Sequence, residues 1–159
     1  MIFNRPWLTL VALLISSLVI ILTSSLHARD WKGLTPGASN RTEVIEKLGQ
    51  PTKEINRGGS LSRGVVYQGQ QKVEGTRQVQ IFFNEEGIID AMNVWPQSQI
   101  TKEQIIKTYG QDFEEKLTDA FKPYLNYKEQ GLVVFLQEGG KMVSSITYQR
   151  PVPKVEGSP

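Results

Sequence analysis

The sequence contains no cysteine and a single histidine, His27, and these two scarcities limit the chemistry that the protein can perform. Without cysteine there is no disulfide, no thiol nucleophile and no thiolate ligand for a metal. His27 lies beside an apolar N-terminal segment, so the rest of the chain has no histidine for a catalytic triad or for most zinc or copper sites. We therefore expect no cofactor, no metal and no enzymatic activity.

Charge is absent between Trp7 and Leu26, where only Thr and Ser interrupt the apolar residues. About 20 such residues span a bilayer as a helix. Arg5 is the only charged side chain upstream, and Ala28 is the candidate cleavage point, although Leu26 at the −3 position fits a signal-peptidase site poorly. We expect residues 1–28 to be a signal peptide or a transmembrane anchor, and both alternatives stay open. The remainder would then be extracytoplasmic in the cell envelope, either anchored in the membrane or periplasmic or secreted after cleavage.

The charged residues are balanced, with 18 Lys and Arg against 16 Asp and Glu and a net charge of +2. Nucleic-acid binding depends on a basic excess that displaces counterions from phosphates. We therefore expect no nucleic-acid partner.

Glycine stops and capping patterns indicate where helices begin and end. Gly49 ends an expected helix over residues 40–48, and Gly110 ends another that begins at Thr101, whose capping-box partner is Gln104. A further short helix that runs to Lys122 is predicted by two patterns. The first is a capping pair, Asp112 with Glu115, and the second is a pair of apolar residues one turn apart, Leu117 with Phe121. Strand-like runs follow glycine-containing turns and cover residues 65–68, 78–83, 88–94, 124–127, 132–137 and 141–148.

The two halves of the chain resemble copies of one unit. The run Val44–Gln50 aligns with Ile105–Gln111, and Ile81-Phe82-Phe83 aligns with Val133-Val134-Phe135. The predicted fold class is α+β: an N-terminal hydrophobic helix followed by two tandem units of short helices packed on antiparallel strands. The first helix-plus-sheet unit is expected over residues 31–96 and the second over 100–149. Residues 150–159 are rich in proline and are expected to form a disordered tail.

Short motifs in both halves resemble those of a known family. The run Leu34–Ser39, then Val44 and Leu48-Gly49-Gln50-Pro51, resembles the signature of BamE/SmpA-like envelope proteins, and Tyr127–Phe135 resembles the hairpin of that family. Tandem copies are similar to the β-lactamase-inhibitor-protein-like fold. The resemblance implies helices on one face of an antiparallel sheet and a role without catalytic residues. The chain departs from the lipid-modified members because it lacks the cysteine that carries the lipid.

Two pairs of adjacent carboxylates are the remaining candidates for catalysis. Glu85 and Glu86 lie in an expected hairpin turn, while Glu114 and Glu115 lie at an expected helix start, where acidic residues favour the helix dipole. We interpret both pairs as solvated or capping residues. A carboxylate-dependent cell-wall hydrolase is kept as an alternative of another class.

A glycine-rich loop with basic residues is the segment best suited to recognition. Arg57 and Arg63 flank it, within a basic group completed by Lys53, Lys72 and Arg77. A guanidinium pairs bidentately with carboxylate or phosphate, so Arg57 and Arg63 are the candidate partner-binding residues. The leading hypothesis is a non-enzymatic protein-binding or assembly module of the cell envelope. An inhibitor of a secreted or envelope enzyme is the alternative within that class.

Overall fold

The computed structural model describes residues 28–56, 63–69 and 72–153. The apolar segment 7–26, the glycine-rich loop with Arg57, and residues 154–159 of the tail lie outside these ranges. Within them, no helix is long and apolar enough to cross a membrane.

Both expected helices beside a glycine stop are present, and each begins at a capping box. Helix α2 spans Arg41–Leu48 and helix α3 spans Lys102–Tyr109. The cap residues are Asn40 and Thr101. The side chain of each accepts a hydrogen bond from the backbone N–H of the residue three positions later, and the side chain of that later residue accepts one from the backbone N–H of the cap residue. Gly49 and Gly110 follow the helices with φ of 79° and 90°, a conformation that glycine adopts without strain.

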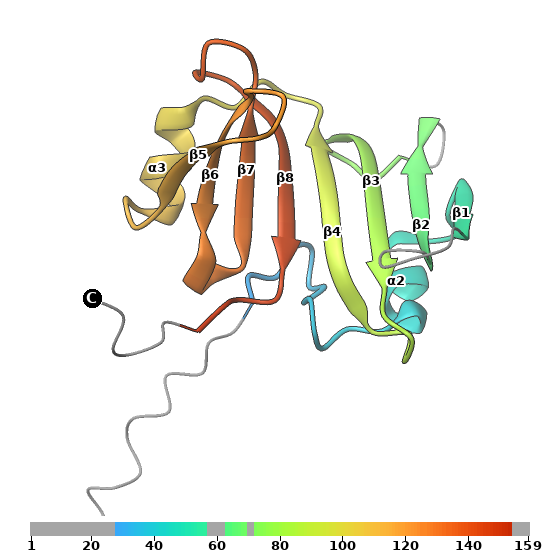
Figure 1. Cartoon of the computed structure of the whole chain (residues 1–159). Helices are drawn as coiled ribbons and strands as arrows, with labels where there is room; N and C mark the ends of the chain where they lie inside the picture. Colours follow the sequence, from blue (N-terminus) through green and yellow to red (C-terminus); the bar gives the residue numbers. More distant parts are fainter. Residues whose placement is uncertain (1–27, 57–62, 70–71, 154–159) are drawn as a thin grey trace, which may run out of the picture.

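The described strands form a single antiparallel sheet. Their order is β1-β2-β3-β4-β8-β7-β6-β5 (Figure 1). The first half of the chain therefore supplies four neighbouring strands and the second half supplies the other four, and β4 pairs with β8 where the two halves meet. Strand β7 is preceded by a short 3-10 helix, η2, over Lys128–Gln130. The strands are β1 (Lys53–Asn56), β2 (Arg63–Gln68), β3 (Thr76–Phe83), β4 (Ile89–Pro96), β5 (Glu114–Leu117), β6 (Pro123–Tyr127), β7 (Leu132–Leu136) and β8 (Val143–Gln149).

The predicted fold class is wrong. The described residues form mostly one eight-stranded antiparallel sheet with two eight-residue helices, and not two separate helix-on-strand units of an α+β fold. The sheet is continuous because Ala91–Val94 of β4 pairs with Ile146–Gln149 of β8. The predicted N-terminal helix lies outside the described residues.

The helix expected over residues 112–122 is also wrong. Glu114–Leu117 is strand β5 and pairs with Pro123–Tyr127, and a turn from Thr118 to Lys122 joins the two strands. The local spacing of Leu117 and Phe121 gave a false helical signal, because both side chains are exposed and contribute to no buried stripe.

Both helices lie on the same face of the sheet, and the core lies between them and the strands. Val44 of α2 and Ile105 of α3 are buried against strand residues that include Tyr67, Ile81, Met92, Leu125, Val134 and Ile146. At the start of the expected disordered tail, Arg150 forms an ion pair with Asp90, and the N–H of Val152 donates to the carbonyl oxygen of Lys128.

Candidate binding surface

The face of the sheet opposite the helices carries no helix among the described residues, although Gly64, Val66 and Phe82 on it are buried. Cross-strand partners share a face, so the register assigns each strand residue to one side. We call the helix-free side of the six inner strands the open face. Its residues are Gly64, Val66 and Gln68 (β2), Gln78, Gln80 and Phe82 (β3), Ala91, Asn93 and Trp95 (β4), Ser145, Thr147 and Gln149 (β8), Val133 and Phe135 (β7), and Tyr124 and Asn126 (β6).

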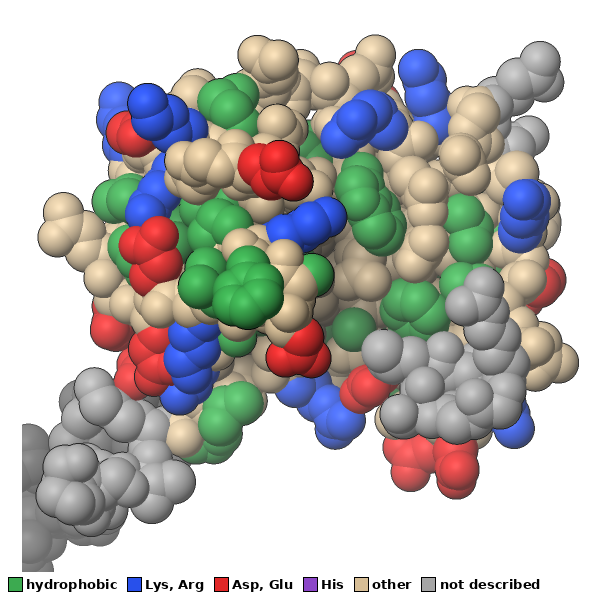
Figure 2. Space-filling view, turned by 45° about the horizontal axis from the view of Figure 1, so that its top comes forward, with side chains coloured by type: hydrophobic (Ala, Val, Ile, Leu, Met, Phe, Trp, Pro, Cys, Tyr) green, Lys and Arg blue, Asp and Glu red, His purple; other side chains and the backbone are tan. Residues whose placement is uncertain are grey.

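None of these open-face residues carries a charge, although charged residues make up 21% of the chain. Among the paired residues of the described strands, the charges on this side lie on the edge strands, with Lys53 on β1 and Glu114 and Lys116 on β5. Arg77 and Asp90 lie at irregularities of the β3–β4 pairing, where the register assigns them to neither side. In the part of the β3–β4 half that Figure 2 leaves visible, hydrophobic and uncharged side chains predominate. A surface of this kind resembles the core of an interface, from which charged residues are depleted.

Asn93 and Thr147 lie at the centre of the open face, directly opposite each other on β4 and β8. The hydroxyl of Thr147 donates a 2.8 Å hydrogen bond to Oδ1 of Asn93. The bond uses the only proton of the hydroxyl, so Thr147 offers lone pairs and the amide of Asn93 offers two N–H donors. A partner can therefore find both donors and acceptors in a fixed arrangement.

Aromatic rings are spread over the same face. Tyr124 and Phe135 are cross-strand partners with ring centroids 5.6 Å apart, and both are only partly buried. Trp95 is partly buried at the end of β4, opposite Gln78. Aromatic side chains combine a large contact area with few rotatable bonds, which suits them to binding.

A solvent-open hollow of about 360 Å³ lies beside β1, β2 and β3. Amide side chains and two apolar residues line most of it, and the charged residues Lys53 and Glu54 of β1 line its outer edge. It continues the open face toward the edge strand.

A second hollow, of about 280 Å³, lies on the helix side, where Trp31 and α3 meet the ends of the central strands. Ile105, Tyr109 and Tyr148 contribute to its lining. Burial raises the pKa of the Tyr148 phenol, and the phenol of Tyr109 beside it adds to the effect. This phenol is therefore a neutral polar group within a mainly apolar wall, and it does not act as a base at neutral pH.

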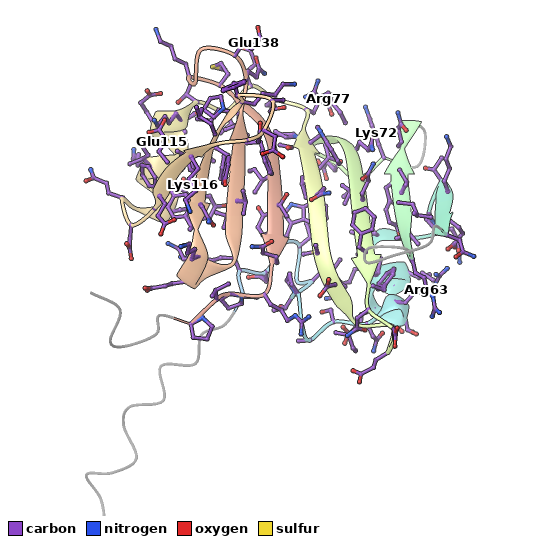
Figure 3. All side chains as sticks on the ribbon, viewed as in Figure 1. Arg63, Lys72, Arg77, Glu115, Lys116 and Glu138 are labelled. Atoms are coloured by element: carbon purple, nitrogen blue, oxygen red, sulfur yellow. The ribbon has the colours of Figure 1, made fainter. Side chains whose placement is uncertain are left out.

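Of the two arginines predicted to bind a partner, Arg57 lies outside the described residues. Arg63 begins β2 and is exposed, but alternation along the strand assigns it to the side of Val65 and Tyr67, which the helices cover. In Figure 3, Arg63 lies at the opposite end of the sheet from Lys72 and Arg77. The structure therefore does not gather the expected basic group into one patch.

The glutamates of the two adjacent pairs lie in ion pairs or in an exposed turn. Glu114 and Glu115 alternate across β5: Glu115 binds Nζ of Lys102 on α3 at 2.8 Å, while Glu114 binds Lys116 and Lys128 at 2.7 Å each. Hydrogen bonds from Lys116 and Lys128 lower the pKa of Glu114 to about 2, so it stays ionised at neutral pH and holds no proton to donate. Glu85 and Glu86 are exposed in a turn. The described part of the chain contains no group of three or more metal-ligating side chains.

The sequence did not indicate which residues form the open face. In the run Ala91–Trp95 of β4, the side chains of Met92 and Val94 face the core. The side chains that alternate with them carry no charge, and this could have been read from the sequence. The pairing of β4 with β8, which joins the two uncharged strips, links residues more than 50 positions apart and has no local signal.

Comparison with known proteins gives a fold likeness and no family. No protein-family model matches the chain, and no curated protein sequence is significantly similar to it. Among solved structures, the crystal structure of YjgB, a DUF4309 family protein of Bacillus subtilis, aligns with a TM-score of 0.56 at 12% sequence identity. The alignment covers 75% of this chain and 83% of that one. At this identity the likeness concerns the fold alone.

Proposed function

We propose that the protein is a non-enzymatic binding module of the cell envelope that contacts a protein partner through the open face of its sheet. The observation that carries the proposal is the absence of charge from the open-face residues, together with the half-buried rings of Trp95, Tyr124 and Phe135 and the preset Asn93–Thr147 pair. Desolvating such a face costs less than desolvating a charged one, because no ion loses its hydration. The envelope location rests on the apolar segment 7–26.

The test begins with a photo-crosslinking amino acid in place of Thr147 in the full chain, used in intact cells to identify the protein that contacts the open face. The affinity of that purified partner is then compared for two matched variants. Gln80→Lys adds a cation to the open face, whereas Gln111→Lys makes the same change at an exposed position after α3. We expect Gln80→Lys to weaken binding at least tenfold, because it buries an unpaired charge, and Gln111→Lys to leave the affinity within twofold. Equal affinities for the two variants would contradict a contact at this face.

An uncharged glycan is a second candidate partner, and the Asn93–Thr147 pair is the observation that favours it. A sugar hydroxyl both donates and accepts, so it matches an amide N–H beside a hydroxyl lone pair, and sugar rings pack flat on aromatic side chains. Calorimetric titration with uncharged oligosaccharides separates the candidates. The glycan is favoured if the wild-type protein releases or absorbs heat in a saturable titration and Asn93→Ala does not. The same conclusion requires that the photo-crosslinking residue at position 147 captures no protein.

A further inference from the structure

The turns that join β3 to β4 and β5 to β6 are built by the same hydrogen bonds. In the first turn, Asn84 N–H donates to the oxygen of Ile88 and Gly87 N–H donates to the oxygen of Asn84, at 2.9 and 3.1 Å. In the second, Thr118 N–H donates to the oxygen of Lys122 and Phe121 N–H to the oxygen of Thr118, at 2.9 and 2.8 Å. Phe121 therefore occupies the position that Gly87 holds in the other turn.

This position requires a left-handed backbone, which bulky side chains avoid. The φ angle is 78° at Gly87 and 57° at Phe121. Among the described residues, Lys32 is the only other non-glycine residue with positive φ, and the turn after β7 places Gly139 and Gly140 in this conformation. Phenylalanine is therefore an unfavourable residue at this position. Because strained residues cluster at functional sites, its presence points to a role in function.

Packing within the domain does not provide that explanation. The Phe121 side chain is 82% exposed, and Leu117, which precedes the same turn, is 60% exposed. These are the most exposed large hydrophobic residues in the described part of the chain, ahead of Val152 at 54%. An apolar ring that the fold leaves in water, on a backbone that disfavours it, is suited to burial in another molecule.

We propose that Phe121, supported by Leu117, is an anchor that enters an apolar pocket of the protein partner. Two backbone hydrogen bonds order the turn before contact, and a phenylalanine side chain has few rotatable bonds, so burial of the ring costs little conformational entropy. The surroundings do not favour an anionic lipid surface, because Lys116 is paired with Glu114 at 2.7 Å and the charge of Asp119 in the turn offsets that of Lys122. The inference rests on the proposed function, since it names a residue that determines the affinity of that contact.

The test places the photo-crosslinking amino acid at position 121 and, separately, at position 147 in the full chain. We expect both positions to crosslink the same protein. With that protein purified, Phe121→Ala and Phe121→Gly should each weaken its affinity by about 30-fold or more, the size typical of an interface hot spot. Val152→Ala, which removes another exposed apolar side chain, should change the affinity less than threefold. Phe121→Gly also serves as the folding control, because glycine suits this backbone.

The outcomes separate the anchor from the proposed function. A protein crosslinked at position 147 but not at 121, or an unchanged affinity in Phe121→Gly, overturns the anchor and leaves the open-face contact standing. No protein at either position overturns both. Crosslinking of position 121 to a second copy of the chain, or Phe121-dependent sedimentation with vesicles of phosphatidylcholine and phosphatidylglycerol, overturns the proposed class of partner.

Discussion

The hydroxyl of Tyr127 on β6 donates a 3.1 Å hydrogen bond to the carbonyl oxygen of Gly110, the residue that ends α3. Tyr67 on β2 makes the same bond, at 2.9 Å, to Gly49 at the end of α2. Each tyrosine thus satisfies a carbonyl group at a helix C-terminus and fixes that end of the helix to the sheet. Arg41 on α2 pairs with Glu54 on β1 as Lys102 on α3 pairs with Glu115 on β5, so the two halves hold their helices by corresponding contacts.

Removing either phenolic hydroxyl should weaken the domain by a similar amount. We expect Tyr67→Phe and Tyr127→Phe each to lower the free energy of unfolding by about 1 kcal/mol, the usual contribution of one hydrogen bond. The two bonds lie in different halves and share no partner, so the double variant should lose roughly the sum. Urea denaturation measures all three variants. A double variant that loses no more than one single variant would show that the bonds are not independent.

Acid should destabilise the domain partly through Glu114. Its pKa is lowered from 4.5 to about 2 in the folded state by hydrogen bonds from Lys116 and Lys128. The ionised carboxylate therefore contributes stability that is fully present above pH 4.5 and is lost as the pH falls through about 2. In Glu114→Gln, unfolding should depend less steeply on pH over this interval, whereas Glu86→Gln, in the exposed β3–β4 turn, should follow the unmodified chain. Because the ion pairs are exposed, 0.5 M salt should reduce the difference between Glu114→Gln and the unmodified chain.

Alkali should destabilise the domain through its buried phenols. Burial raises the pKa of Tyr148 above its ordinary value of 10.0, and it raises those of Tyr67 and Tyr127 in the same direction. The neutral phenols thus contribute stability that is fully present below pH 10 and is lost as the pH rises through the folded-state values. The melting temperature should fall above pH 10. Tyr148→Phe should show a smaller fall, and an identical fall in that variant would exclude Tyr148 as a contributor.

Local sequence signals were sufficient for the two helices. Thr101 and Gln104 form the capping box that their spacing predicts, and Gly49 and Gly110 directly follow the last helical residues with positive φ. These features depend only on residues within a few positions of one another, so they can be read without knowledge of the fold.

The errors arise where distant pairing decides the structure. Asp112, Glu115 and Leu117 have helical spacing, yet Glu115 binds Lys102 and pairs across strands with Leu125. Both partners lie outside the local window in which the helical pattern was recognised. The same reason applies to the candidate surface, because its centre requires Asn93 to meet Thr147. A lone arginine such as Arg63 offers suitable chemistry in the sequence, but only the register assigns it to the covered side.

Exchanging the residues at positions 87 and 121 should change stability in opposite directions. The left-handed backbone costs a non-glycine residue about 1–2 kcal/mol, and glycine offsets part of this difference because it loses more freedom on folding, by roughly 0.5–1 kcal/mol. Phe121→Gly should therefore raise the free energy of unfolding by up to about 1 kcal/mol, since the 82% exposed ring contributes little packing. Gly87→Phe should lower it by about the same amount. A Cβ at position 87 meets no atom within 4 Å apart from its chain neighbours, so the expected loss comes from the backbone conformation and not from a clash at Cβ. Urea denaturation of both variants measures the changes. A clear loss of stability in Phe121→Gly would show that the ring packs within the domain, and Phe121 would then be a structural residue rather than an anchor held for a partner.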